Sequence, residues 1–141
     1  MASPAPDPAT IARLHAAALA VRERAWAPYS RFAVGAAVLD AQGRVHAGCN
    51  VENAAYPQGW CAETSALAAM IAAGGTEVVA ALVVGDGPLP TTPCGGCRQR
   101  LREFAGDDCR VYAADAAGVR ESHTLGELLP AAFGPGHLKW R

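Results

Sequence analysis

The sequence predicts a single three-layer α/β domain, in which a sheet lies between two layers of helices. Its 141 residues are about the length of one ordinary domain, and no shift in composition marks a second one. Segments with helical and strand spacing follow one another in the order α-β-β-α-β-α-β-β-α, which is typical of helices packed on a central sheet. We therefore expect residues 1–141 to form one domain.

The first helix is expected to begin at Pro8 and to stop before Pro28. Apolar residues recur between these positions at helical spacing, Asp7 is a good N-cap, and proline suits the first helical position. Three prolines within residues 1–8 predict an extended, poorly ordered lead-in to the helix.

The other elements are predicted from apolar runs that end at glycine, proline or polar turns. The expected strands are 32–39, 44–49, 78–84, 109–113 and 119–123. The expected further helices are 61–73, 95–104 and 125–129. Polar loop 50–60 and Gly/Pro loop 85–93 each precede one of these helices.

The charge balance argues against a polyanionic partner. Twelve Lys and Arg and thirteen Asp and Glu give a formal net charge of −1, whereas proteins that coat nucleic acid or bind membrane surfaces usually carry a basic excess. The apolar stretches are much shorter than the roughly 18 to 20 residues of a membrane span. No basic segment precedes an apolar one at the N-terminus, so we expect no signal peptide and a cytoplasmic protein.

Three of the five cysteines stand where a loop enters a predicted helix. Cys61 begins one helix, and Cys94 and Cys97 form a Cys-x-x-Cys at the start of another. Helix N-termini stabilise thiolates, and this spacing brings two sulfurs near one point. Three sulfurs with no obvious fourth ligand fit a catalytic zinc that keeps one position for water. A thioredoxin-like redox pair is the alternative.

The remaining candidate ligands are assigned to packing or to the surface. Cys49 and Cys109 adjoin apolar strands and are predicted to be inert buried thiols, although a structural four-ligand zinc would need one of them or a histidine. The four histidines have no ligand spacing to one another. Glu63 shares the first helical turn with Cys61, so it is the acid predicted to carry a proton beside the metal.

Several motifs in the same order resemble the cytidine deaminases, in particular the small homotetrameric zinc type. The motifs span most of the chain and are segments 27–37, 48–57, 61–63, 93–99 and 127–133. The resemblance implies a three-layer α/β/α fold with a mixed sheet of about five strands, and one Zn²⁺ per subunit. It also implies hydrolytic deamination of cytidine and 2′-deoxycytidine to uridine and 2′-deoxyuridine, with release of ammonia, in pyrimidine salvage.

The resemblance also implies a role for individual residues. Cys61, Cys94 and Cys97 match the zinc ligands, and Glu63 matches the proton shuttle. The positions that match substrate-binding residues are Phe32 at the pyrimidine, Asn50 and Glu52 at the ribose, the Ala62 backbone at the base, and Tyr56 and Phe133 at a neighbouring subunit's site. Asn50 and Glu52 are two residues apart, so on an extended segment both point the same way.

One position departs from the pattern. Many tetrameric relatives carry an arginine directly after the catalytic glutamate, where this chain has Thr64. Three thiolates around Zn²⁺ leave a negatively charged site, so we expect Arg98 and the two helix N-termini to compensate. The Thr64 hydroxyl is a further candidate donor to a sulfur.

Other functions remain open. A deaminase of a cytosine-containing aminonucleoside antibiotic of the blasticidin S type, or of modified cytidines, would share the zinc core. The near-zero charge disfavours nucleic-acid editing. A catalytically inactive zinc-binding homologue is disfavoured because Glu63 is intact.

Overall fold

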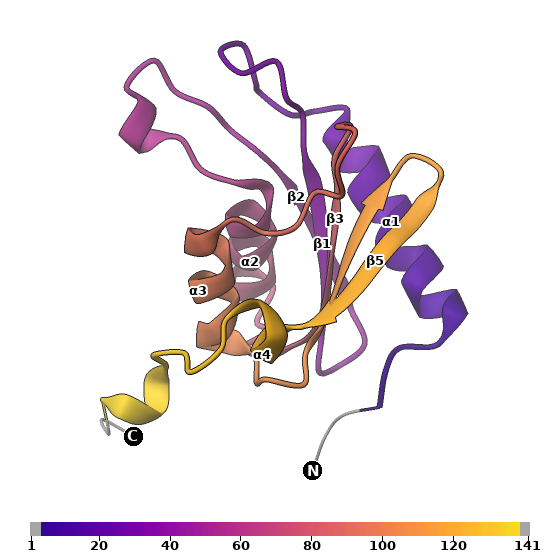
Figure 1. The fold of residues 1–141 in the computed structure, drawn as a ribbon, viewed down its shortest axis with the longest axis vertical. Helices are drawn as coiled ribbons and strands as arrows, with labels where there is room; N and C mark the ends of the chain where they lie inside the picture. The colour runs from indigo at the N-terminus through magenta and orange to yellow at the C-terminus, as the bar shows by residue number, and fades with distance from the viewer. Residues whose placement is uncertain (1–3, 139–141) are drawn as a thin grey trace.

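The computed structural model describes residues 4–138, and a five-stranded mixed sheet lies at its centre (Figure 1). The strands are β1 (Gly35–Asp40), β2 (Val45–Cys49), β3 (Val78–Val84), β4 (Arg110–Asp115) and β5 (Gly118–Thr124). They lie in the order β2-β1-β3-β4-β5, with β3 and β4 parallel and every other neighbouring pair antiparallel. The predicted mixed sheet is therefore confirmed.

Helices cover both faces of this sheet, which confirms the three predicted layers (Figure 1). Helix α1 (Pro8–Arg22) packs on one face, where Leu14 and Ala18 meet Leu82 of β3. The helices of the other face are α2 (Ala62–Ala72), α3 (Gly95–Phe104) and α4 (Leu125–Leu128). Two short 3₁₀ helices, Tyr56–Gln58 and Pro135–His137, complete the regular elements of the described residues. Among residues 4–138, no helix has the length and apolar character needed to cross a membrane.

Helix α1 begins as expected and ends earlier than expected. The Asp7 carboxylate accepts a hydrogen bond from Thr10 N at 2.8 Å, and Pro8 opens the helix. The expected lead-in over residues 1–8 therefore overlaps the helix start, and residues 1–3 lie outside the described part of the chain. After Arg22 the backbone leaves the helix and pairs with the loop that follows β2, where Trp26 N donates to Asn50 O at 3.0 Å.

Strand β1 begins three residues later than the expected start of 32. The Asn50 side chain takes the place of a strand partner there: its Oδ1 accepts from Val34 N and its Nδ2 donates to Phe32 O, each at 2.9 Å. An extended segment bonded to a side chain forms no ladder, so Phe32 lies in a loop. These hydrogen bonds of the Asn50 side chain fix the position of Phe32.

Two glycines let the helices approach the sheet. A Cβ at Gly35 of β1 would lie 2.0 Å from Ala18 O of α1, and one at Gly48 of β2 would lie 2.3 Å from Ala66 N of α2. Both distances are far below van der Waals contact, so only glycine fits at these crossings. The close packing of α2 on β2 sets the position of the N-terminus of α2, where the candidate site lies.

The far end of the β1–β2 hairpin is held by a buried carboxylate. Asp40 is 1% exposed, and its two oxygens accept hydrogen bonds from Gln42 N, Arg44 N, Arg44 Nε and His46 Nε2 at 2.8–2.9 Å. Burial alone would raise the pKa of Asp40, but the bonds from His46, Arg44 and Gln42 together lower it well below its usual range. This network lies on turn and strand residues outside the cysteine cluster.

Candidate active site and metal centre

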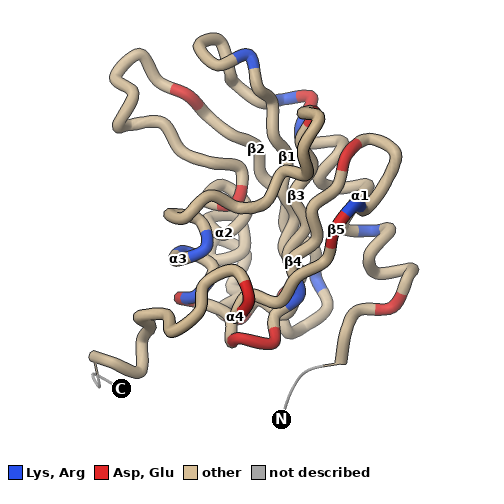
Figure 2. Tube along the Cα trace, viewed as in Figure 1, with Lys and Arg blue, Asp and Glu red and all other residues tan. Residues whose placement is uncertain are grey.

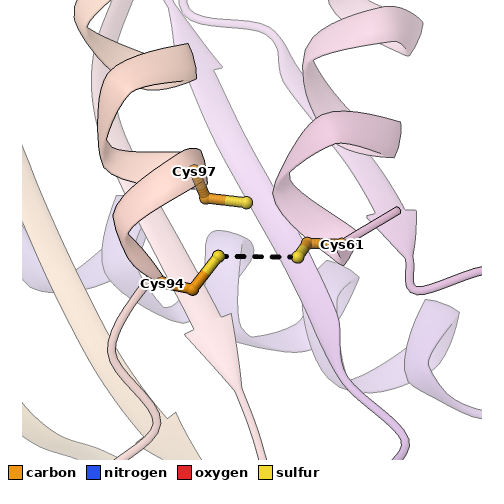
Figure 3. Close-up of side chains that lie close together, drawn as sticks. All are labelled: Cys61, Cys94 and Cys97. Atoms are coloured by element: carbon orange, nitrogen blue, oxygen red, sulfur yellow. Dashed lines mark hydrogen bonds between the residues drawn. The ribbon is translucent and has the colours of Figure 1, made fainter. Parts of the chain in front are cut away.

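The three predicted ligand cysteines meet between the N-termini of α2 and α3 (Figure 3). Their Sγ atoms all lie within 4.8 Å of one another, and those of Cys61 and Cys94 are 3.7 Å apart. A zinc ion about 2.3 Å from each of three tetrahedral thiolate ligands holds their sulfurs roughly 3.8 Å apart. The sulfur cluster therefore fits one zinc ion in both donor type and spacing.

The local fold explains why the sulfurs converge. Cys61 is the N-cap of α2 and Cys94 is the N-cap of α3, and neither cap is made by a side-chain hydrogen bond. Cys97 lies one turn into α3, on the same helix face as Cys94. The positive ends of both helix dipoles thus point at the sulfurs, which favours their thiolate forms. Hydrogen bonding to Cys97 lowers the pKa of the Cys61 thiol, whereas the same bond and burial raise the pKa of the Cys97 thiol.

Glu63 is the buried acid beside this cluster. It lies in the first turn of α2 and is 4% exposed. Burial raises its pKa, and its own backbone N–H, the Cys97 thiol and the charge of Arg100 oppose that rise without cancelling it. A raised pKa makes a carboxyl group a better proton acceptor, which suits general acid–base catalysis beside a bound substrate.

A cavity of about 460 Å³ opens next to the sulfurs. Its lining brings together seven residues selected from the sequence: Phe32, Asn50, Glu52, Cys61, Ala62, Glu63 and Cys94. The third cysteine of the cluster, Cys97, is fully buried. The volume suits a ligand of small-molecule size, since such pockets commonly measure about 300 to 1,000 Å³.

Asn50 and Glu52 both line this cavity, as their spacing predicts. Each side chain also forms hydrogen bonds with backbone groups of the chain. The Glu52 carboxylate accepts bonds from Tyr29 N and Ser30 N at 3.0 Å each, and from the Ser30 hydroxyl. These bonds, with that of the Ser30 hydroxyl largest, lower the pKa of Glu52. Glu52 is therefore charged at neutral pH and oriented before a ligand arrives.

Two predicted site residues lie outside the cavity. Tyr56 is 73% exposed and packs edge-on against Tyr29, with ring centroids 5.8 Å apart. Phe133 is 47% exposed and packs against His137 near the end of the described chain. Neither lines the cavity of its own chain.

The two residues expected to compensate the thiolate charge do not contact the sulfurs. The Arg98 guanidinium donates to Pro93 O at 2.7 Å, Leu128 O at 2.8 Å and Thr92 Oγ1 at 3.2 Å. The Thr64 hydroxyl is buried and has no hydrogen-bond partner among residues 4–138, so the expected bond to a sulfur is not formed. Arg98 instead ties the segment before Cys94 to α4.

Sequence reasoning missed several residues of the site. Ser30, Trp60 and Thr92 line the cavity, and each directly precedes or lies within two residues of a predicted site residue. Arg100 places Nη1 3.8 Å from Cys97 Sγ. Its spacing of three from Cys97 on a helix was a usable signal, because residues three apart share a helix face.

Comparison with known proteins agrees with this geometry. The family model "Cytidine and deoxycytidylate deaminase zinc-binding region" matches residues 8–113. A cytidine deaminase of Halalkalibacterium halodurans is 46% identical over 116 residues, which cover 82% of this chain and 88% of the relative. One of Mycobacterium tuberculosis is 47% identical over 111 residues, covering 78% of this chain and 79% of the relative.

Solved structures give the same answer. The crystal structure of a cytidine deaminase from Burkholderia pseudomallei superposes with a TM-score of 0.80 at 44% identity, covering 86% of this chain and 98% of that one. The cytidine deaminase structure from Mycobacterium tuberculosis gives a TM-score of 0.76 at 40% identity, with 87% and 96% covered. With its sulfur cluster, buried glutamate and shared fold, this chain belongs to the cytidine and deoxycytidylate deaminase family.

Proposed function

We propose that this chain catalyses the hydrolytic deamination of cytidine and 2′-deoxycytidine to uridine and 2′-deoxyuridine, with release of ammonia, and that it serves pyrimidine salvage in the cytoplasm. The observation that carries the proposal is the three-sulfur cluster beside buried Glu63 at the edge of a nucleoside-sized cavity. The named cytidine deaminase relatives support the substrate. All five cysteines are free thiols, which suits a reducing compartment.

Cys61, Cys94 and Cys97 would hold the zinc ion. When bound, zinc supplies a Lewis acid that lowers the pKa of a water molecule at its open position. Glu63 accepts a proton from the attacking water and delivers it to N3 of the cytosine ring, and water oxygen forms the new bond to C4. Glu63 then takes the remaining proton from the new C4 hydroxyl and passes it to the amino group, so the C4–N4 bond breaks, ammonia leaves and the C4 carbonyl of uridine forms.

The cavity lining provides the remaining roles. Phe32 is 38% exposed and offers its ring as a wall for the pyrimidine. Asn50 and Glu52 offer an amide and a carboxylate to the ribose hydroxyls, and Ala62 offers backbone to the base. Polar groups that bind a sugar hydroxyl lose a partner when an analogue lacks it, so such a site disfavours that analogue. This pair also favours a nucleoside over a blasticidin-type antibiotic, and turnover on the two substrates separates these functions.

The direct test measures zinc content and ammonia release from cytidine on the same sample. Cys94→Ala should lose bound zinc and activity together, because two thiolates hold the ion far more weakly than three. Cys49→Ala is the matched control, since Cys49 is a half-buried thiol outside the cluster and its loss should leave zinc content unchanged. Full zinc occupancy in Cys94→Ala removes Cys94 from the ligand set.

We further propose a homotetramer whose sites are shared between subunits. The support is that Tyr56 and Phe133 present exposed rings that do not line the cavity of their own chain. Phe133→Ala should lower kcat/KM by about tenfold while zinc content stays at the wild-type level, because each site loses a wall supplied by its neighbour. Light scattering on the wild type should give four chains per particle, and a fully active monomer contradicts the proposal.

A further inference from the structure

The proposed zinc site has a charge imbalance that α2 does not correct. Three thiolates exceed the two positive charges of a zinc ion, and buried Glu63 adds a further carboxylate nearby. Glu63 is the only charged residue of α2, and Thr64, which follows it, offers the sulfurs no bond. Excess negative charge in a site sheltered from water makes the metal a weaker Lewis acid. Beyond the helix dipoles, a compensating charged side chain must therefore come from another element.

Helix α3 carries the arginines that α2 lacks (Figure 2). Three of its ten residues are Arg98, Arg100 and Arg102. Arg98 is bonded to Pro93 O, Leu128 O and Thr92 Oγ1, and Arg102 donates to Ala105 O at 2.9 Å. Arg100 is the one whose guanidinium contacts a ligand sulfur among the described residues, with Nη1 3.8 Å from Cys97 Sγ.

The backbone of the Cys-x-x-Cys turn leaves room for this contact. A Cβ at Gly96 would lie 3.1 Å from Arg100 Nη1, so the guanidinium rests over the turn between Cys94 and Cys97. Cys97 is 0% exposed, and an N–H donor close to a buried thiolate acts in surroundings where water screens it little. Arg100 does not line the substrate cavity, so it acts on the sulfur and not on the nucleoside.

We propose that Arg100 is a positioning residue that offsets the thiolate charge at Cys97, and so tightens zinc binding and keeps the bound ion an effective Lewis acid. This inference rests on the proposed zinc-dependent function. A guanidinium keeps its charge at every physiological pH, and a hydrogen bond to a thiolate favours that thiolate over the thiol. The compensating side-chain charge of this chain thus comes from α3, and Thr64, which follows Glu63, does not have to supply it.

The test compares three variants of the full chain. Arg100→Met keeps the length of the side chain and removes its charge, Arg100→Lys keeps the charge, and Arg24→Met removes one charge from an exposed position after α1. Zinc affinity is measured without substrate by competition with a chromophoric chelator, and kcat and KM for cytidine are measured on zinc-loaded protein. Circular dichroism checks that each variant is folded.

We expect Arg100→Met to weaken zinc affinity or lower kcat by about 10- to 100-fold, while KM for cytidine stays within about twofold. Arg100→Lys should recover most of the loss, and Arg24→Met should match the wild type. Wild-type zinc affinity and kcat in Arg100→Met overturn the inference. So does an Arg100→Lys variant as impaired as Arg100→Met, since that result points to shape and not to charge.

Failure of the inference is distinguishable from failure of the proposed function. If the wild-type chain binds no zinc or releases no ammonia from cytidine, the proposed function itself is wrong. If the wild type is active and Arg100→Met is indistinguishable from it, the proposed function stands and only the role of Arg100 is withdrawn. The substrate-free zinc affinity keeps the readout independent of turnover.

Discussion

Glu63 and Asp40 are the two charged side chains buried among the described residues, and their surroundings are opposite. Asp40 receives four hydrogen bonds from the hairpin that it closes, and its pKa falls well below the usual range although burial acts to raise it. Glu63 stands beside three sulfurs, and burial raises its pKa. Burial acts to raise the pKa of both carboxyl groups, and the donors around Asp40 outweigh it whereas those around Glu63 do not.

This difference separates a structural carboxylate from a catalytic one. A carboxylate that accepts several hydrogen bonds is stabilised in its ionised form and takes up a proton only at low pH. Asp40 can therefore hold the backbone of the hairpin in place. A carboxyl group that is buried with less compensation has a raised pKa and takes up a proton more readily, which suits a group that carries a proton. Substitutions that remove only the charge of each residue test the comparison directly.

The largest expected effect follows from Glu63→Gln. The amide keeps the size of the side chain but carries no proton between water and substrate, so kcat should fall by about 10²- to 10⁴-fold or more while zinc stays bound. Ammonia release and zinc content on one sample measure both. Asp40→Asn is the matched control, because the same chemical change at the other buried carboxylate should leave turnover of the folded protein nearly intact. Near-normal activity in Glu63→Gln would remove Glu63 from its proposed role.

The second effect is on stability and concerns Asp40. In Asp40→Asn an amide replaces a carboxylate that four donors address, so the free energy of unfolding should fall by about 3 kcal/mol at pH 7, as read from urea denaturation. Asp86→Asn is the control, since Asp86 pairs with Arg22 at 2.9 Å but its side chain is 68% exposed. Its loss should cost under about 1 kcal/mol.

The pH dependence of this difference has a fixed sign. The folded-state pKa of Asp40 lies below its value in the unfolded chain, so Asp40 contributes stability above the unfolded pKa of about 3.9 and loses it as pH falls toward the folded value. Wild type and Asp40→Asn should therefore differ most near neutral pH and converge below about pH 4. A gap that stays constant from neutral to acid pH contradicts the assigned pKa direction.

The sequence predicted the parts of the site that depend on local rules. Helix starts at Cys61 and Cys94, and the turn-to-helix spacing of Cys97, follow from capping and periodicity, and the structure brings all three sulfurs together. Arg98 was assigned to the sulfurs because it follows Cys97, but its direction is set by contacts with Thr92, Pro93 and Leu128. Adjacency in a helix does not fix direction, because successive residues point about 100° apart.

Long-range contacts explain the other differences. Asp40 falls between the expected strands 32–39 and 44–49, and its burial depends on His46 of the partner strand and on the end of α2, where Arg44 donates to Ala73 O at 3.0 Å. The start of β1 moved because the Asn50 side chain bonds across to Val34. The proposed roles of Tyr56 and Phe133 involve a second chain, which the pattern of one chain does not position.

The smallest expected effect tests how dry the surroundings of Glu63 are. Thr64 follows Glu63 in α2, and its buried hydroxyl has no hydrogen-bond partner within residues 4–138. Thr64→Val replaces that hydroxyl with a methyl group of similar size, so the free energy of unfolding should rise by up to about 1 kcal/mol.

Thr92→Val is the matched control for this change. The Thr92 hydroxyl accepts a bond from Arg98 Nη2 at 3.2 Å, so the same substitution there should lower the free energy of unfolding by about 1 kcal/mol. Opposite signs for the two threonines, read from urea denaturation of zinc-free protein, would support a dry and sparsely bonded environment next to Glu63. A loss of stability in Thr64→Val as large as in Thr92→Val would mean that water or another partner satisfies the Thr64 hydroxyl. In that case burial would explain less of the raised pKa of Glu63, and the contrast with Asp40 would narrow.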